Sequence, residues 1–353
     1  MNSKSLDGDA IVYCEGAFNT PNGKTAHGLV RFTERYQVLG VIDSRYAGKD
    51  AGEVLDGKRN GIPVFASLSD ALGQTKPKYF VIGLAPDGGR LPAEARETVK
   101  DAICHNLNVD SGLHDFLSDD PEIAALARQY NVGIRDVRKT PNRKDLHFFT
   151  GNIEKVGCLK IAVLGTDSAV GKRTTAWLIV HGLRASGYKA EMIGTGQTGW
   201  MQGAKYSLIL DSLINDFVSG EIEYAVYEAW KNENPDAIII EGQGSLLNPA
   251  YPGGFEILAA GRPDIIVLQH TPTRKEYDGF PGYALHPLPH QIHALEFISG
   301  KKVVAVTVNH EGLQPDQIDE ACAQITKETG LPAFDVLVYG AEGLVELLTG
   351  YLK

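Results

Sequence analysis

Short apolar runs alternate with helical stretches along the whole chain. In the first part, these runs lie at residues 10–14, 37–42, 61–65, 79–82, 106–109 and 132–134. Farther on, they lie at residues 159–164, 190–193, 237–240, 265–268 and 303–307. Runs of this length are typical of buried strands, and their alternation with helices predicts parallel α/β sheets. The first group predicts a Rossmann-like sheet of five or six strands.

A basic stretch separates the two groups of strands. Residues 138–152 read RKTPNRKDLHFFTGN, contain Pro141 and show no hydrophobic periodicity. Such a stretch is typical of a linker. With 353 residues in the chain, two domains are expected, one at residues 1–140 and one at residues 141–353.

Composition narrows the class of protein. The chain is 43% hydrophobic and 22% charged, with a net charge of −10, which favours a globular fold and argues against a nucleic-acid partner. The polar first nine residues predict no secretory leader, and no apolar run is long enough to span a membrane. The cysteines Cys14, Cys104, Cys158 and Cys322 are scattered, as expected of free thiols in a cytoplasmic protein.

The strongest motif is LKIAVLGTDSAVGKRTT at residues 159–175. A buried strand leads into a glycine-bearing loop, then into Gly171-Lys172 and a helix over 172–186, which is the context of a P-loop. The predicted fold is therefore α/β, a Rossmann-like parallel sheet followed by a P-loop NTPase-like domain. The expected phosphate-binding residues are Gly165, Thr166, Asp167, Ser168, Ala169, Val170, Gly171, Lys172, Arg173, Thr174 and Thr175.

This loop departs from the standard pattern at two points. The spacing from Gly165 to Gly171 is one residue longer, and Arg173 stands where a hydroxyl would bind Mg²⁺. Phosphate binding is therefore expected, whereas Mg²⁺-dependent nucleotide hydrolysis is disfavoured.

Polar residues also follow other strands of the same predicted sheet. Ligands in open α/β sheets bind at the carboxyl ends of strands. The loop after residues 190–193 carries Gln197, Thr198 and Gly199, which could bind a polar ligand or form a flexible turn. Glu241 follows the next strand and precedes Gln243. Burial would raise the pKa of Glu241 and make it a usable base, unless it is a solvated strand-end acid.

The loop after residues 265–268 adds a histidine and an arginine. His270, with a pKa expected near neutrality, could take a proton or be an ordinary buried polar side chain. Arg274 could bind a carboxylate with both nitrogens. Asp211 and Asp216 could orient an amine, or cap and solvate a helix.

Two further patterns resemble a metal site and a dinucleotide site but lack the features that either needs. His286, His290 and His293 have metal-like spacing, but Pro287 and Pro289 interrupt any helix before His290, so no metal site is predicted. Asp43 ends the second strand, where a dinucleotide ribose would bind, but the first loop lacks GxGxxG. NAD binding is therefore disfavoured.

Six stretches together resemble one family along nearly the whole chain: GLAPDGGRLP (83–92), SGLHDFLSDDPE (111–122), GTDSAVGKRTT (165–175), GTGQTGWM (194–201), DFVSGEIE (216–223) and IIEGQGSLLNPAY (239–251). That family joins a Rossmann-like domain to a P-loop domain and includes the D-glutamate N-acetyltransferase of bacterial D-glutamate breakdown. The resemblance implies acetyl transfer from acetyl-CoA, as co-substrate, to the amino group of D-glutamate. The P-loop would then bind the CoA phosphates, with Arg173 supplying charge where Mg²⁺ normally lies.

Candidate roles follow from the chemistry of this transfer. Glu241 or His270 would be the base, Lys172 would lie near the thioester or phosphates, and Asp211 is a further candidate. Arg274, with Gln197 or Gln243, would bind the carboxylates of a small amino-acid substrate.

Two alternatives remain open. The phosphate loop also resembles that of dethiobiotin synthetase, which implies a ligase or kinase that uses ATP and Mg²⁺ on a small carboxylate or amine. The chain could also be a nucleotide- or CoA-binding module without turnover. A homo-oligomer is the default expectation for such enzymes.

Overall fold

The computed structural model describes residues 7–352, apart from the side chain of Asp87. It divides the chain into two units. One consists of Met1–Thr140 with Trp200–Gly203, and the other of Pro141–Gly199 with Ala204–Lys353. Residues 1–6, part of the segment in which no leader is predicted, lie outside the described residues.

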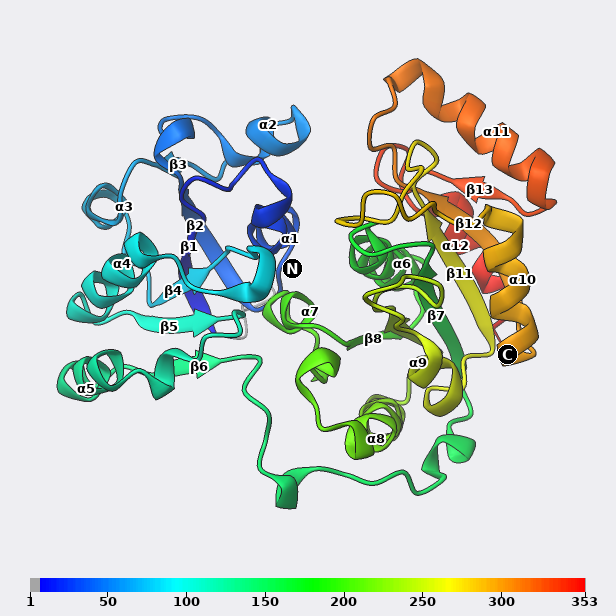
Figure 1. The fold of residues 1–353 in the computed structure, drawn as a ribbon, viewed down its shortest axis with the longest axis horizontal. Helices are drawn as coiled ribbons and strands as arrows, with labels where there is room; N and C mark the ends of the chain where they lie inside the picture. Colours follow the sequence, from blue (N-terminus) through cyan, green and yellow to red (C-terminus); the bar gives the residue numbers. More distant parts are fainter. Residues whose placement is uncertain (1–6, 353) are drawn as a thin grey trace. The chain divides into compact units, whose positions relative to one another are not determined.

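The first unit contains a parallel sheet of six strands in the order β3-β2-β1-β4-β5-β6 (Figure 1). The strands are β1 Gly8–Tyr13, β2 Tyr36–Ile42, β3 Val64–Phe65, β4 Tyr79–Ile82, β5 Asn108–Ser111 and β6 Ile134–Asp136. The helices are α1 Lys24–Arg31, α2 Ala51–Asp56, α3 Leu68–Gln74, α4 Ala93–Cys104 and α5 Pro121–Tyr130. This is the strand order of a Rossmann-like fold.

Local sequence explains how several of these helices begin. The side chains of Asp50, Ser67 and Asp120 accept hydrogen bonds from backbone amides in the first turns of α2, α3 and α5. Such caps satisfy amides that have no partner within the helix.

Four residues from far along the chain complete the first unit. The Gln202 amide donates to the carbonyls of Gly28 and Phe32, both at 2.9 Å. The Arg35 guanidinium lies 3.8 Å from the centroid of the Trp200 ring and donates to the Trp200 carbonyl at 2.8 Å. Cation–π contacts of this kind stabilise a packed surface. The sequence does not anticipate that residues 200–203 belong with this unit.

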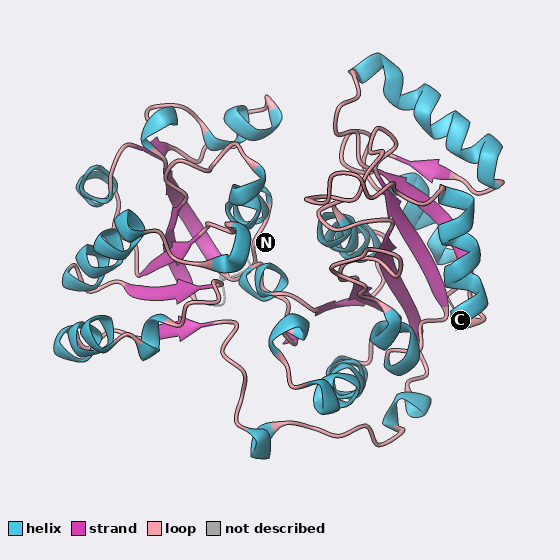
Figure 2. Cartoon of the chain, viewed as in Figure 1, coloured by secondary structure: helices cyan, strands magenta, loops and turns pink. Residues whose placement is uncertain are grey.

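The second unit contains a parallel sheet of seven strands in the order β13-β12-β11-β7-β10-β8-β9. The strands are β7 Leu159–Gly165, β8 Ala190–Gly194, β9 Tyr206–Ser207, β10 Ala237–Glu241, β11 Ile265–His270, β12 Lys302–Val308 and β13 Ala333–Phe334. The helices are α6 Lys172–Ala185, α7 Gln197–Met201, α8 Asn215–Glu233, α9 Phe255–Ala260, α10 Leu288–Ser299, α11 Ile318–Thr329 and α12 Glu342–Thr349. Figure 2 shows helices on both sides of the central strands of this unit.

Alternate side chains of these strands enter two buried layers. Ala162, Leu164 and Ile240 share one hydrophobic cluster with residues of α8, α9 and α10. Ile161 and Val163 are equally buried and point to the opposite face, because successive strand residues alternate. α6 contacts that face, and α12 packs on α6. Strands covered on both faces read as continuous apolar runs, which is why they stand out in the sequence.

The α/β class and the two parallel sheets confirm the predicted fold. Element ends differ by a few residues. β5 begins at Asn108 rather than at Asn106, because Asn106 adopts a positive φ of 61° and belongs to the preceding turn. The two-residue edge strands β9 and β13 were not predicted.

The prediction that the prolines interrupt any helix before His290 is confirmed for His286, which no helix includes, but is wrong for Pro289. α10 begins at Leu288 and carries Pro289 in its first turn, where a missing amide costs no helical hydrogen bond. His286 lies before the helix, with its Nδ1 2.8 Å from the Tyr277 hydroxyl. Within residues 7–352, no group of three or more His, Cys, Asp or Glu side chains is arranged to hold a metal ion.

None of the helices in the described part of the chain is long and apolar enough to cross a membrane.

Candidate functional site

The predicted site residues of the second unit lie at the carboxyl ends of parallel strands. β7 leads into the phosphate loop, β10 ends at Glu241, and β11 ends at His270. β7 lies between β10 and β11 in the sheet. The loops that follow these strands therefore emerge side by side at one edge, where α/β proteins bind ligands.

The phosphate loop has the backbone form that exposes amides to an anion. Ala169 and Gly171 adopt positive φ angles of 53° and 105°, and α6 begins at Lys172 directly after them. Left-handed residues turn successive N–H groups inward, and the helix N-terminus adds a partial positive charge. This geometry is that of an anion-binding loop.

Lys172 is buried beside this loop. Its ammonium donates to the carbonyls of Asp167 at 2.7 Å and Gly244 at 2.8 Å. A Cβ on Gly165 would lie 2.8 Å from Lys172 Cδ and 2.9 Å from Val170 Cγ2, so the glycine leaves room for the lysine in this position. These contacts hold the lysine between the phosphate loop and the loop after β10.

Asp167 is the fully buried centre of the loop network. Its Oδ1 accepts from the Ser168 amide at 2.7 Å and from Asn248 Nδ2 at 2.8 Å. Its Oδ2 accepts from Arg274 Nη1 at 2.9 Å and from the Asp278 amide at 2.8 Å. Asp167 therefore ties together three loops.

Arg274 is engaged with protein groups. Besides Asp167, it donates to the Ser168 carbonyl and to Glu311, both at 2.8 Å. Although burial alone would lower the pKa of Arg274, its hydrogen bond with Asp167 and nearby carboxylates raise it, so the guanidinium stays charged. These contacts occupy both terminal nitrogens of the side chain that was expected to bind substrate carboxylates.

Glu241 is buried, with 4% of its surface exposed. Burial raises the pKa of its carboxyl, against the opposing charges of Arg173 and Lys172. The direction predicted from its place after an apolar strand is confirmed. Its Oε2 accepts from the Thr195 amide at 3.0 Å. A Cβ on Gly199 would lie 2.6 Å from the same oxygen.

The loop after β8 lies against Glu241. The Thr195 hydroxyl donates to the Glu241 carbonyl at 3.0 Å and accepts from Gln243 Nε2 at 2.9 Å. Gln197 and Thr198 are buried at the start of α7. The structure thus brings Gln243 and Gly199 beside Glu241.

His270 is buried with its Nδ1 3.0 Å from the Thr166 hydroxyl. Burial, together with the charges of Lys275 and Arg274, lowers its pKa to about 4. The expectation of a near-neutral pKa is therefore wrong, because the imidazolium would lie in a dry and already cationic region. His270 is a neutral side chain at physiological pH.

Asp211 and Asp216 are exposed. Asp211 lies in a short 3-10 helix at Leu210–Ser212, and the Leu210 amide donates to the Thr195 carbonyl at 3.0 Å. Asp216 lies in the first turn of α8, where a carboxylate complements the helix dipole.

Two polar side chains that no sequence motif marked support the phosphate loop. Gln269 Oε1 accepts from the hydroxyls of Thr175 at 2.5 Å and Thr307 at 2.6 Å. Asn309 Nδ2 donates to the Val170 carbonyl at 2.9 Å. Thr175, expected to bind phosphate, therefore has its hydroxyl committed to Gln269. Gln269 follows the apolar residues of β11, and this polar position near the end of a buried strand could have marked it in the sequence.

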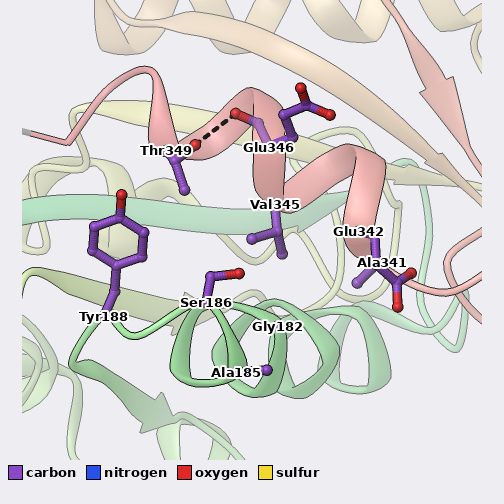
Figure 3. A pocket seen from close by; sticks show the side chains of 9 residues that line it. All are labelled: Gly182, Ala185, Ser186, Tyr188, Ala341, Glu342, Val345, Glu346 and Thr349. Carbon is purple, nitrogen blue, oxygen red and sulfur yellow. Dashed lines mark hydrogen bonds between the residues drawn. The ribbon is translucent and has the colours of Figure 1, made fainter.

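Two cavities lie away from this site. One, of about 420 Å³, lies between the last turn of α6 and α12, with Val345 of α12 directed toward α6 (Figure 3). The other, of about 450 Å³, lies in the first unit and is lined by Tyr13, Ile42 and Ser67 among others. Neither is lined by the residues predicted to act in binding or catalysis.

Asp43, next to the second cavity, has both oxygens engaged within the protein. They accept from the Phe18 amide at 2.9 Å and from Arg45 at 2.6 and 2.9 Å.

Comparisons with known proteins agree with this architecture. Two curated relatives are similar over most of the chain. A D-glutamate N-acetyltransferase of Tritonibacter scottomollicae is 32% identical over 277 residues, which are 77% of this chain and 81% of the relative. One of a Pseudoalteromonas species is 29% identical over 275 residues, 76% of this chain and 80% of the relative.

A solved structure covers nearly the whole fold. The crystal structure of a DUF1611 family protein from Anabaena variabilis superposes with a TM-score of 0.89 at 30% identity, covering 97% of this chain and 99% of that one. Residues 147–345 match the P-loop domain DUF1611 and residues 44–140 match the Rossmann-like domain DUF1611_N, both described as domains of unknown function. The chain therefore belongs to the DUF1611 family, with its Rossmann-like N-terminal and P-loop C-terminal domains.

Proposed function

We propose that the protein is an N-acetyltransferase that transfers the acetyl group of acetyl-CoA to the amino group of D-glutamate. The two curated relatives of that name, at 29–32% identity over about three quarters of the chain, support this assignment. In this proposal, the phosphate loop binds the phosphates of CoA and hydrolyses no nucleotide.

The observation that carries the proposal is Arg173, directly after Lys172 at the start of α6. A Mg²⁺-dependent P-loop has a hydroxyl at this position, and the Thr175 hydroxyl nearby is bound to Gln269. A guanidinium beside the lysine suits a ligand whose negative charge is not already balanced by a metal ion. The inward amides of the loop and the two cations fit the pyrophosphate of CoA.

The chemical step needs a base close to the acceptor amine. Glu241 is the candidate, because its raised pKa makes it a stronger base than an exposed glutamate. In the proposed step, the amine loses a proton to the Glu241 carboxylate and its nitrogen bonds to the acetyl carbon. The carbon–sulfur bond then breaks, and the thiolate of CoA takes up a proton.

The test is release of free thiol from acetyl-CoA in EDTA without ATP, with D-glutamate, L-glutamate or no acceptor. Thiol release that depends on D-glutamate, with N-acetyl-D-glutamate as the product, is expected. Absence of release with every acceptor would overturn the proposal.

A second candidate is a Mg²⁺- and ATP-dependent ligase or kinase of a small carboxylate or amine. It is favoured by Glu241, a carboxylate at the end of the strand beside the phosphate loop, where P-loop enzymes hold their metal ion. It predicts ADP release with a strict Mg²⁺ requirement. A binding module without turnover would instead bind CoA or a nucleotide and release no product in either assay.

A further inference from the structure

Three aromatic rings meet in two loops of the P-loop domain. Tyr251 and Phe280 have ring centroids 6.2 Å apart, and Phe280 and Tyr283 have theirs 6.4 Å apart. Both pairs meet edge to face. Tyr251 is 59% exposed and Tyr283 is 58% exposed. Single exposed aromatic residues are ordinary, whereas a cluster of them at one place indicates a contact surface. We call these three residues the aromatic trio.

The loop that carries Tyr251 is fastened to the phosphate loop. Asn248 Oδ1 accepts from the Ala250 amide at 2.9 Å and the Tyr251 amide at 2.7 Å. Asn248 Nδ2 donates to Asp167 at 2.8 Å. One asparagine thus fixes the backbone of Tyr251 relative to the phosphate loop.

A second contact joins Tyr251 to the lysine of the loop. Gly244 has a φ of 50°, and a Cβ there would lie 2.0 Å from the Tyr251 carbonyl oxygen. The Gly244 carbonyl in turn accepts from Lys172. Because Gly244 has no side chain, the Tyr251 backbone packs directly against it, and the carbonyl of the same glycine accepts from the Lys172 ammonium.

The loop that carries Phe280 and Tyr283 is held by the same aspartate. The Asp278 amide donates to Asp167 Oδ2 at 2.8 Å. Backbone hydrogen bonds from the Phe280 amide to the Tyr277 carbonyl and from the Tyr283 amide to the Phe280 carbonyl fold the segment on itself. Asp167 thus anchors both aromatic loops, one through Asn248 and the other through the Asp278 amide.

We infer that the aromatic trio binds the adenine ring of the acyl donor, beside the phosphate loop that binds its phosphates. Adenine is planar and stacks on aromatic faces with little need for hydrogen bonds. Tyrosine rings supply such faces at low conformational cost, because they have few rotatable bonds. The inference rests on the proposed function in taking the donor to be CoA.

The experiment measures binding of three probes: adenosine 3′,5′-bisphosphate, CoA and 4′-phosphopantetheine, which lacks adenine. The variants are Tyr251→Leu and Tyr283→Leu, which keep an apolar side chain without a ring, and Tyr251→Phe and Tyr283→Phe, which keep the ring. Phe297→Ala is the control, because Phe297 is 80% exposed on α10 near the amino end of β12, away from the strand ends that form the site.

Each leucine variant is expected to weaken binding of adenosine 3′,5′-bisphosphate and CoA about tenfold, the usual worth of one stacked base. Phosphopantetheine binding stays unchanged, and the phenylalanine variants bind all probes like the wild type. The inference is overturned if the wild type does not bind adenosine 3′,5′-bisphosphate, if the leucine variants match Phe297→Ala, or if they weaken phosphopantetheine equally. The last two results would leave the trio as a structural feature or a protein-binding surface.

The bisphosphate titration requires no acetyl transfer, so the two proposals fail separately. Ring-dependent binding without transfer to D-glutamate would refute only the proposed function. If the leucine variants bound CoA and transferred acetyl to D-glutamate like the wild type, only the role of the trio would be refuted.

Discussion

Asp167 Oδ2 and Arg274 Nη1 form an ion pair at 2.9 Å, with the carboxylate fully buried and the guanidinium 12% exposed. The pair joins the loop after β7 to the loop after β11. Sequence alone suggests that each residue contacts a ligand. The structure instead pairs them with each other, which gives them a role in fixing the loops.

Replacing Asp167 with asparagine should destabilise the protein. The neutral amide would leave the buried Arg274 guanidinium with the exposed Glu311 as its ionic partner, and loss of one partner of a buried ion pair costs about 3 kcal/mol. Urea unfolding measures the change in the free energy of unfolding. The control is Glu311→Gln, which removes the exposed partner of Arg274 and should cost less than about 1 kcal/mol. Equal effects of the two variants would contradict the assigned role of Asp167.

Glu241→Gln should abolish most of the proposed acetyl transfer. Loss of a general base lowers kcat by about 10²- to 10⁴-fold, while KM for acetyl-CoA should change little. The matched control is Glu154→Gln, at a side chain that is 63% exposed. An unchanged kcat in Glu241→Gln would exclude Glu241 as the base.

The raised pKa of Glu241 also predicts a pH dependence. A base works when deprotonated, so the rate should fall as pH drops through a pKa above 4.5, the ordinary value for glutamate. In a stability measurement the sign is opposite. A folded-state pKa above the unfolded value favours folding at low pH, and this contribution is lost as pH rises. Between pH 4 and 8, the free energy of unfolding of Glu241→Gln should therefore rise relative to that of the wild type as pH increases. A difference between the two proteins that is constant with pH would contradict this.

His270 should stay neutral down to pH 5, because its pKa is lowered from 6.5 to about 4. The unfolded chain then binds a proton that the folded chain does not, so stability is lost as pH falls from about 6.5 toward 4. The loss should reach about 3 kcal/mol, and His270→Asn should remove it. His290→Asn, at an exposed position, is the control. An imidazole NMR signal of His270 that titrates near pH 6.5 would refute the prediction.

Gly182→Ala should loosen the packing of α12 on α6. A Cβ at Gly182 would lie 2.5 Å from Val345 Cγ2; both residues line the cavity between α6 and α12 (Figure 3). Overpacking of this kind costs roughly 1–3 kcal/mol, measurable as a lower urea midpoint. Gly73→Ala in α3 meets no atom within 4 Å and should be neutral or slightly stabilising. If Gly182→Ala were as stable as Gly73→Ala, α12 would be able to move away from α6 without a loss of stability, which would contradict the prediction.

The fold was predictable where local signals are strong. β7, the phosphate loop and α6 follow one another within residues 159–185, and their apolar runs and glycines mark them directly. The edge strands β9 and β13 are only two half-buried residues long, which is too short for any periodicity. The placement of Trp200–Gly203 depends on partners about 170 positions away, such as Phe32, so no local pattern encodes it.

The position of the candidate residues in the fold could be predicted from the sequence, whereas their contacts could not. Strand ends indicated Glu241, Lys172 and His270, because parallel strands deliver their loops to one edge. The partners of Arg274 could not be inferred, since Asp167 is 107 positions away and an arginine suits a ligand carboxylate equally well. The lowered pKa of His270 likewise arises from burial and from cations that fold around it.

The proposed function requires that the phosphate loop bind the acyl donor without a metal ion. Its most direct test is equilibrium binding of CoA in EDTA to the wild type and to Lys172→Ala, with Mg²⁺-ATP as a competitor. We expect CoA to bind in EDTA and Mg²⁺-ATP to compete poorly. Binding to Lys172→Ala should be at least tenfold weaker, because charge-assisted hydrogen bonds contribute about 1.5–3 kcal/mol. Tight Mg²⁺-dependent binding of ATP with no binding of CoA would contradict the proposed function.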